Sequence, residues 1–467
     1  MSRKVRLIVN VRIEAGFVAM LLVGASLPAY AAPGDHIRAG DAVITPSVMT
    51  GIEAHSNLYL ADGGDQSPEV SAMAWVLKPR VQLDLNARTV IFNLGAGYGL
   101  KKFIDFYPDD DFHPENADRF SDFDADLALQ LFPQSKIGAK LVDKFQNEAL
   151  PAELPTAEGN ATANVIHTGN DLSGGVVLRP GSALSFDVLG QVGIDTYDVP
   201  EVLTTEDNAA FNGRTQYGPI VNGTWKFLPK TSMVASFSYN FLRWDNNLIE
   251  ALGPDIEGSD IGSYIGKPDA DAWRLTAGVT GQFTQKLAAS AQVGFGMMTY
   301  DETTVLEDPK AASLAGSSNE LNVVGEETFA TDTSIGDGVL INLQVSYAPL
   351  RGHTLTAGYR KDFQDAVFTN YVAYNYVFLR YEGTLQNRFG VGGELSYRLD
   401  DFHGEVARAD QNLLAKVNAS YKFTPWLSAG ASGSWARRAC GSQDCDTTFY
   451  STQYDDFSGT LGATFTY

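Results

Sequence analysis

The sequence predicts an all-β protein, a transmembrane antiparallel up-and-down β-barrel of eighteen strands, with sixteen as the alternative count. Three observations predict it. Apolar and polar residues alternate with a period of two through much of the chain. Short turns alternate with longer polar loops. The chain is rich in residues that favour strands or tight packing, with 45 Gly, 26 Phe and 20 Tyr against 6 His and 2 Cys.

The alternation is clearest at the end of the chain. Leu461, Ala463, Phe465 and Tyr467 lie on one face of the predicted strand, and small polar residues lie on the other. Residues 413–423, 391–399, 339–347 and 273–283 repeat the pattern with polar residues on the second face, which are charged in three of the four segments. A Lys or Arg facing lipid at the midplane costs about 2–4 kcal/mol, so the charged face must line water. Phe465 and Tyr467 resemble the C-terminal assembly signal of outer-membrane barrels, which implies the barrel assembly machinery as a partner.

The connections set the strand count. Eight short turns are predicted near residues 86–88, 133–135, 180–181, 229–230, 285–286, 350–352, 386–388 and 424–425. Longer acidic or polar loops separate them, such as 151–164 and 301–332. Eight turns and nine loops give eighteen strands, with the turns on the periplasmic side. Residues 366–376 fit least well, because aromatic residues crowd a predicted loop.

Aromatic residues are expected to form belts at both membrane surfaces. Those near the turns are Phe227, Phe283, Tyr347, Phe423, Trp426 and Tyr467; those near the loops are Tyr59, Tyr107, Trp244 and Tyr300.

The N-terminus predicts export. Basic residues precede an apolar run over residues 16–27, and Ala29-Tyr30-Ala31 follows as a cleavage signature. We expect residues 1–31 to be a signal peptide and residues 32–467 to be a barrel in the outer membrane of a Gram-negative bacterium. The net charge of −22 disfavours nucleic acid as a partner. Outer-membrane lipids and lipopolysaccharide are the expected surroundings.

No motif indicates catalysis. The sequence contains no P-loop, no H-E-x-x-H and no G-x-S-x-G. We therefore expect no enzymatic activity, no cofactor and no metal site. Cys440 and Cys445 form a C-x₄-C pair in the last long loop and are disulfide candidates.

The alternation nominates residues that line the interior. The charged candidates are Arg380, Glu382, Glu394, Arg398, Lys416 and Lys422, and the amide candidates are Asn342 and Gln344. Each can contact a solute in transit, and each charged candidate can equally form a structural ion pair across the interior. The segment 301–332 is long enough to fold inward as a constriction or to form an outer lid.

Several motifs resemble one family. Gly51-Ile52-Glu53-Ala54-His55-Ser56-Asn57-Leu58-Tyr59 is similar to the G-Y-[DE]-x-S-N motif that opens the type-2 outer-membrane β-barrel porins, with Ile52 where the family prefers Tyr. Residues 353–362 look like a recurrent hairpin of that family, and residues 421–427 look like its penultimate turn. Some members serve exopolysaccharide, capsule or spore-coat export and work with a periplasmic polysaccharide export protein.

Three functions remain open on the sequence. By resemblance, the chain is expected to be a channel for polysaccharide secretion across the outer membrane. The alternative is a general or substrate-selective diffusion porin for small solutes, with residues 301–332 as its filter. A third hypothesis is a surface protein whose loops bind partners.

Overall fold

The computed structural model describes residues 36–58, 69, 71–105, 121–156, 159–198, 213–244, 269–300, 303–304, 328–329, 338–365, 371–403, 408–440 and 453–467. The predicted signal peptide, Tyr59, Tyr107, Cys445 and nearly all of the segment 301–332 lie outside these residues. In that segment, the described strands β13 (Thr303–Thr304) and β14 (Thr328–Phe329) pair with each other. No helix among the described residues has the length and apolar character needed to cross a membrane.

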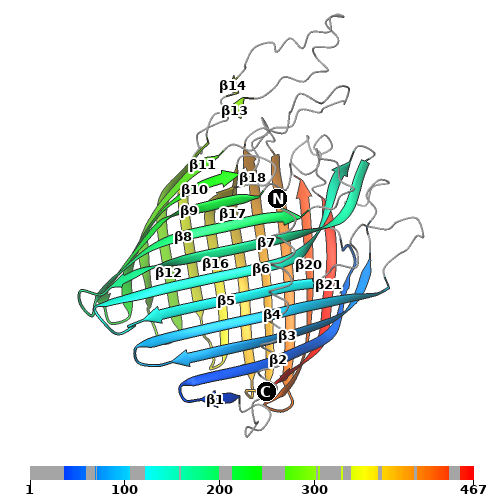
Figure 1. Ribbon diagram of the computed structural model, residues 1–467, viewed down its shortest axis with the longest axis horizontal. Helices are drawn as coiled ribbons and strands as arrows, with labels where there is room; N and C mark the ends of the chain where they lie inside the picture. The colour runs from blue at the N-terminus through cyan, green and yellow to red at the C-terminus, as the bar shows by residue number, and fades with distance from the viewer. Residues whose placement is uncertain are drawn as a thin grey trace, which may run out of the picture.

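Eighteen antiparallel strands form one closed barrel, as predicted (Figure 1). Each strand pairs with the next one in the chain, and β2 pairs with β21 from Ser47↔Thr466 to His55↔Ser458, which closes the cylinder. The three-residue strand β1 (Ile37–Ala39) pairs only with β2. The barrel strands are β2 (Ala42–His55), β3 (Ala72–Asn86), β4 (Val90–Asp105), β5 (Ser121–Leu131), β6 (Ile137–Thr156), β7 (Gly159–Leu178), β8 (Leu184–Asp198), β9 (Arg214–Leu228), β10 (Thr231–Trp244), β11 (Ala270–Gln282), β12 (Leu287–Tyr300), β15 (Val339–Tyr347), β16 (His353–Asp365), β17 (Tyr371–Leu385), β18 (Phe389–His403), β19 (Arg408–Lys422), β20 (Leu427–Cys440) and β21 (Tyr454–Thr466).

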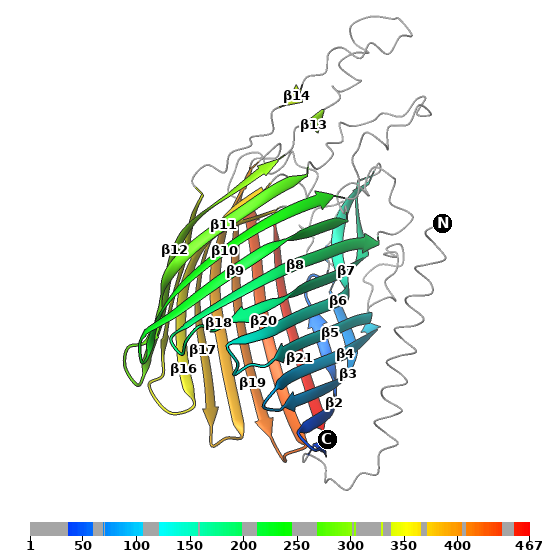
Figure 2. The ribbon, with the colours of Figure 1, turned by 60° about the vertical axis from the view of Figure 1, so that its left-hand side comes forward.

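All eight predicted short turns join consecutive strands at one end of the barrel, which we call the turn end (Figure 2). The connections at the other end, the loop end, are less uniform than predicted. The expected loop 151–164 is wrong, because β6 and β7 are 20 residues each and pair as far as Thr156↔Gly159. The aromatic segment 366–376 is mostly strand, since β17 begins at Tyr371.

Large apolar side chains cover the outer surface of the barrel. On strands β18, β19 and β21, Leu395, Val417 and Leu461 are 53%, 65% and 64% exposed. Near the turns, Phe227, Phe283, Tyr347, Phe423 and Trp426 are also exposed, which agrees with the predicted aromatic belt at this end. An exposed apolar surface around a closed barrel, in which every strand edge is paired, is the arrangement that hydrocarbon requires.

The aromatic residues at the loop end behave differently. Tyr300, predicted as part of a belt, is only 5% exposed, and its ring stacks on Tyr371 at 6.4 Å. Both belong to a buried cluster with Met298 and Phe363, together with Leu242, Ala270, Ala272 and Leu340. β15 is the shortest barrel strand, at nine residues, and begins only at Val339, at this level. The cluster therefore packs β10–β12 against β16 and β17 where the wall is least complete.

The seam between the first and last barrel strands carries a polar clamp. Asp456 on β21 accepts hydrogen bonds from the Asn57 backbone N–H at 3.1 Å and the Ser56 hydroxyl at 3.4 Å. The Nδ1 atom of His55 lies 3.4 Å from the same carboxylate, and the Nε2 atom lies 3.0 Å from Glu53. The motif that resembles the type-2 porins thus joins the two ends of the barrel, and Asn57 is fully buried there.

Candidate functional site

The barrel interior is the candidate functional site, and strand alternation positions its side chains. On β17, Val377 and Leu379 point outward and are 50% and 46% exposed, so Arg380 and Glu382 take the opposite face. Side chains from well-separated strands meet on this face. Arg214 on β9 lies 3.3 Å from Asp365 on β16, with four strands between them in the sheet.

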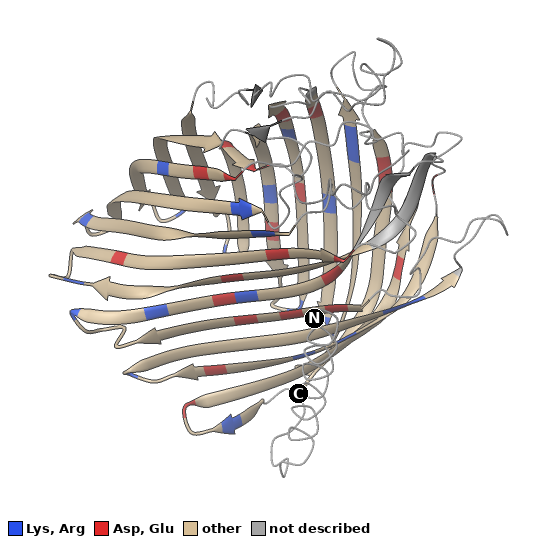
Figure 3. Cartoon of the chain, turned by 45° about the horizontal axis from the view of Figure 1, so that its top comes forward, with Lys and Arg blue, Asp and Glu red and all other residues tan. Residues whose placement is uncertain are grey.

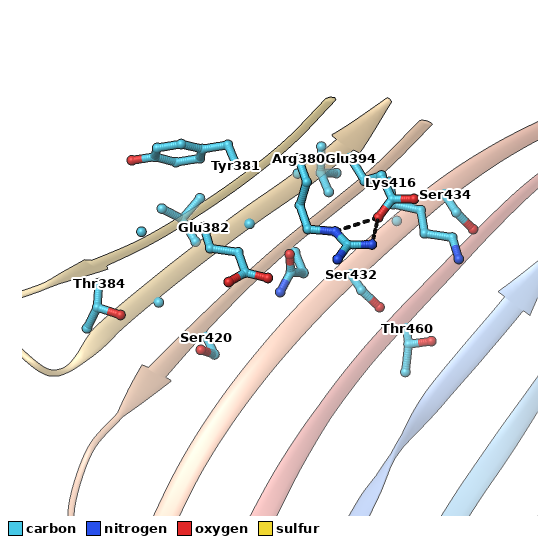
Figure 4. A pocket seen from close by; sticks show the side chains of 18 of the residues that line it. Arg380, Tyr381, Glu382, Thr384, Glu394, Lys416, Ser420, Ser432, Ser434 and Thr460 are labelled. Carbon is cyan, nitrogen blue, oxygen red and sulfur yellow. Dashed lines mark hydrogen bonds and ion pairs between the residues drawn. The ribbon is translucent and has the colours of Figure 1, made fainter. Parts of the chain in front are cut away.

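A cavity of about 730 Å³ lies against the inner wall of β16–β21. Its lining is rich in glycine and in short polar side chains, as Figure 4 shows. Side chains this short leave open space beside the wall, and their hydroxyl and amide groups offer hydrogen bonds to water or a solute. The uncharged polar members of the lining are Thr354, Thr384, Asn418, Ser420, Ser432, Ser434, Ser458 and Thr460.

Four of the predicted interior residues line this cavity: Arg380, Glu382, Glu394 and Lys416. Arg380 and Glu394 form an ion pair, with Nη2 2.7 Å and Nε 2.8 Å from the same carboxylate oxygen. The Tyr376 hydroxyl donates to Glu394 at 3.3 Å. Among the described residues, Glu382 and Lys416 have no ion-pair partner within 4.0 Å (Figure 4). The wall therefore presents one satisfied pair and two charges that remain open to solvent or solute.

The other four predicted residues lie apart from that cavity. Nε of Arg398 lies 2.5 Å from Asp400 on the same strand, and its guanidinium stacks over the Tyr374 ring at 4.3 Å. These contacts with neighbouring residues of the barrel wall hold the Arg398 side chain in place. Lys422 ends β19 at the turn end. Asn342 and Gln344 lie on β15, in register with Gln292 and Ser290 of β12. The structure therefore distributes the eight candidates over several levels of the interior and does not gather them in one site.

One interior group escaped the sequence reasoning. Arg80 on β3 reaches across β4 and forms ion pairs with Asp124 and Asp126 on β5. The crossing is open because Gly95 and Gly97 of β4 lie beneath it, and a Cβ on Gly97 would stand 2.7 Å from Asp124 Oδ1. The signal was present in the glycine run at 95–99, but the sequence does not say which charges meet above it. Figure 3 shows Lys and Arg (blue) and Asp and Glu (red) on many strands of the barrel.

A second missed group runs around the wall at the loop end. His167 Nε2 lies 3.0 Å from Asp195, whose other oxygen accepts from Arg214 Nη2 at 2.7 Å. Arg214 continues to Asp365 across a smaller cavity of about 280 Å³. Asp195 and Asp365 are far apart in the sequence, so no local pattern could have joined them. This series of ion pairs narrows the interior between β9 and β16.

The remaining predicted residues are placed as follows. Cys440, the last residue of β20, is disulfide-bonded, and the described residues include no free cysteine. Phe465 is 45% exposed on the outer surface, and the Tyr467 backbone N–H donates to Pro46 O at 2.9 Å across the seam. Within the described part of the chain, no group of three or more His, Cys, Asp or Glu side chains could hold a metal ion.

Together, the fold and the interior define the class of the protein. It is a transmembrane β-barrel of the kind that spans the outer membrane of Gram-negative bacteria, with an apolar exterior and a polar, water-accessible interior.

Comparisons with known proteins add limited information. No family model matches the chain, and no curated protein matches it. Among solved structures, Pseudomonas aeruginosa OpdK with vanillate is 12% identical at a TM-score of 0.44, covering 91% of this chain and 99% of that one. P. aeruginosa OccK2 (OpdF) in complex with glucuronate is 13% identical at 0.44, covering 91% and 98%. Acinetobacter baumannii OccAB3 is 12% identical at 0.42, covering 92% and 100%.

Likenesses at this level identify neither a family nor a substrate. The resemblance to type-2 porins has no family match behind it, and the export subtype has no support among the comparisons.

Proposed function

We propose that the protein is a channel for passive, substrate-selective diffusion of small polar solutes across the outer membrane. The observation that carries this proposal is the cavity of about 730 Å³ against the inner wall of β16–β21. A cavity of this size suits a small molecule. Its hydroxyl groups and its two unpaired charges, Glu382 and Lys416, supply the few polar contacts that give such a site selectivity.

The interior charges favour small solutes over a polymer. Arg214 bridges to Asp365, and Arg274 Nε lies 3.3 Å from Asp362, so two ion pairs join β9 and β11 to β16. Ion pairs that reach over the intervening strands narrow the interior at the loop end, which would restrict the passage of a wide chain. The polysaccharide export predicted by resemblance finds no comparable support, and the alternative predicted from the sequence is the function that we propose.

Two measurements test the proposal. In planar bilayers, we expect a stable open channel whose conductance falls in Ser432→Trp, because the indole would fill the cavity. The matched control is Leu461→Trp on the outer face of β21, which should leave conductance unchanged because Leu461 is 64% exposed to the membrane. In liposome swelling, monosaccharides and amino acids should permeate faster than an oligosaccharide.

The charged lining gives a second readout. Lys416→Gln removes an unpaired interior cation, so the ratio of anion to cation permeability should fall. Arg437→Gln, on the outer face of β20 and opposite Leu413, should leave the ratio unchanged. Absence of conductance in the wild-type protein, or equal swelling with monosaccharide and oligosaccharide, would overturn the proposal.

A further inference from the structure

The turn end of the barrel is basic throughout. Seven of the eight turns between barrel strands carry one Lys or Arg each, and none of the eight carries Asp or Glu. The basic residues are Arg88, Lys136, Arg179, Lys230, Lys286, Arg351 and Arg388. This is unexpected in a chain whose net charge is −22. Figure 3 shows blue segments recurring at this end.

Two cations of this basic rim, Lys136 and Arg179, meet a third from the end of β9, Lys226, at one cavity. Lys136, Arg179 and Lys226 line a space of about 360 Å³ between neighbouring turns, together with Ser135, Ser182 and Ser185 and the small residues Gly181 and Ala183. Backbone hydrogen bonds hold the three close. Arg179 N–H donates to Lys136 O at 2.7 Å, and Lys226 N–H donates to Ala183 O at 2.7 Å.

These cations are not neutralised by the protein. Among the described residues, no carboxylate lies within 4.0 Å of any of the three, and the lining of the cavity contains no acidic residue. Asp187 lines a separate space of about 90 Å³ together with Arg179 and Lys140. The cavity therefore concentrates positive charge with no counter-charge in its lining.

The guanidinium of Arg179 is partly fixed in place. Its Nη1 donates to the Ser135 backbone carbonyl at 3.3 Å, which ties it to the preceding turn. A guanidinium has five N–H donors, so most remain available. The serine hydroxyls around it can donate as well. A fixed guanidinium, two ammonium groups and several hydroxyls suit a group that presents several anionic oxygens at once.

We propose that this cavity is a binding site for a phosphate group. Phosphate presents anionic oxygens in several directions, matching donors that come from two turns and from the ends of β8 and β9. Two sources can supply it: a soluble phosphate compound on the turn side, or the headgroup of a phospholipid in the adjacent leaflet. Trp225 and Phe227, exposed on the outer face beside Lys226, mark the membrane surface close to the site.

The experiment uses the full chain, purified and folded in detergent, and titrates it calorimetrically with inorganic phosphate. The site variant is Lys136→Gln with Arg179→Gln, and Lys226→Gln alone is a milder second variant. The control is Lys230→Gln with Arg351→Gln, which removes two rim charges outside the cavity. The site variants should weaken phosphate binding about tenfold or more, as expected for lost charge-assisted hydrogen bonds, while the control stays within about twofold.

A second experiment, with lipids, distinguishes a soluble phosphate compound from a phospholipid headgroup. Native mass spectrometry of protein released from phosphatidylglycerol nanodiscs counts retained lipids in the wild type and in each variant. Binding of inorganic phosphate in lipid-free micelles identifies a soluble ligand; lipid retention without it identifies a headgroup. Equal weakening by site and control variants would overturn the proposal, because it indicates diffuse electrostatics, and so would a wild type that binds neither probe. Channel conductance is measured separately, so the phosphate site and the proposed channel function are tested independently.

Discussion

The polar clamp at the seam supports a quantitative prediction for Asp456→Ala. The substitution removes the acceptor for the Asn57 backbone N–H, bonded at 3.1 Å, and for the Ser56 hydroxyl at 3.4 Å. It also removes the carboxylate that faces His55. Asp456 is 6% exposed and Asn57 is 0% exposed, so water cannot readily replace these contacts.

The magnitude follows from the hydrogen bonds lost. A buried donor left without its acceptor costs about 1–3 kcal/mol, and loss of the charged partner adds to this. We expect the free energy of unfolding to fall by about 2–4 kcal/mol. With an m-value near 3 kcal/mol per M of urea, the midpoint should fall by about 1 M.

The assay is urea unfolding of the barrel in phospholipid vesicles, followed by tryptophan fluorescence. Asp456→Asn keeps an oxygen acceptor and should cost less than Asp456→Ala. The control is Asp455→Ala, next in the chain but bonded to exposed Trp435 at 3.2 Å, which should cost less than about 1 kcal/mol. An Asp456→Ala midpoint equal to that of the wild type would refute the role of the clamp.

Three further outcomes are expected in the same unfolding assay. Gly218→Ala should destabilise by about 1–3 kcal/mol, because its Cβ would stand 1.8 Å from the Tyr239 backbone oxygen, whereas Gly190→Ala on the adjacent strand meets nothing within 4 Å and should be neutral. Tyr371→Ala should cost about 3–5 kcal/mol because Tyr371 is 1% exposed, and Tyr347→Ala, 43% exposed, should cost much less; equal costs would contradict the buried cluster. Arg80→Gln should change the free energy of unfolding by less than about 1 kcal/mol, since Arg80, Asp124 and Asp126 are 37%, 57% and 50% exposed; a larger loss would show that the bridge is structural.

The sequence by itself determined the barrel. A period of two assigns each residue to one face or the other, so the apolar exterior could be predicted from Leu461, Val417 and their equivalents. The eighteen strands followed from the count of turns and loops, and the turns were placed well because Pro, Gly and Asn restrict the backbone locally. The aromatic belt near the turns could be predicted because the belt residues lie next to the turns in the sequence.

Only the tertiary structure decided which interior residues meet. The predicted belt residue Tyr300 packs inward because β15 begins only at Val339 and leaves a place that Tyr371 and Phe363 help to fill. Arg214 meets Asp365 only after the sheet has curved through four intervening strands. Alternation assigns a face but not a neighbour across the interior, because such contacts depend on strand register and barrel curvature accumulated over the whole chain.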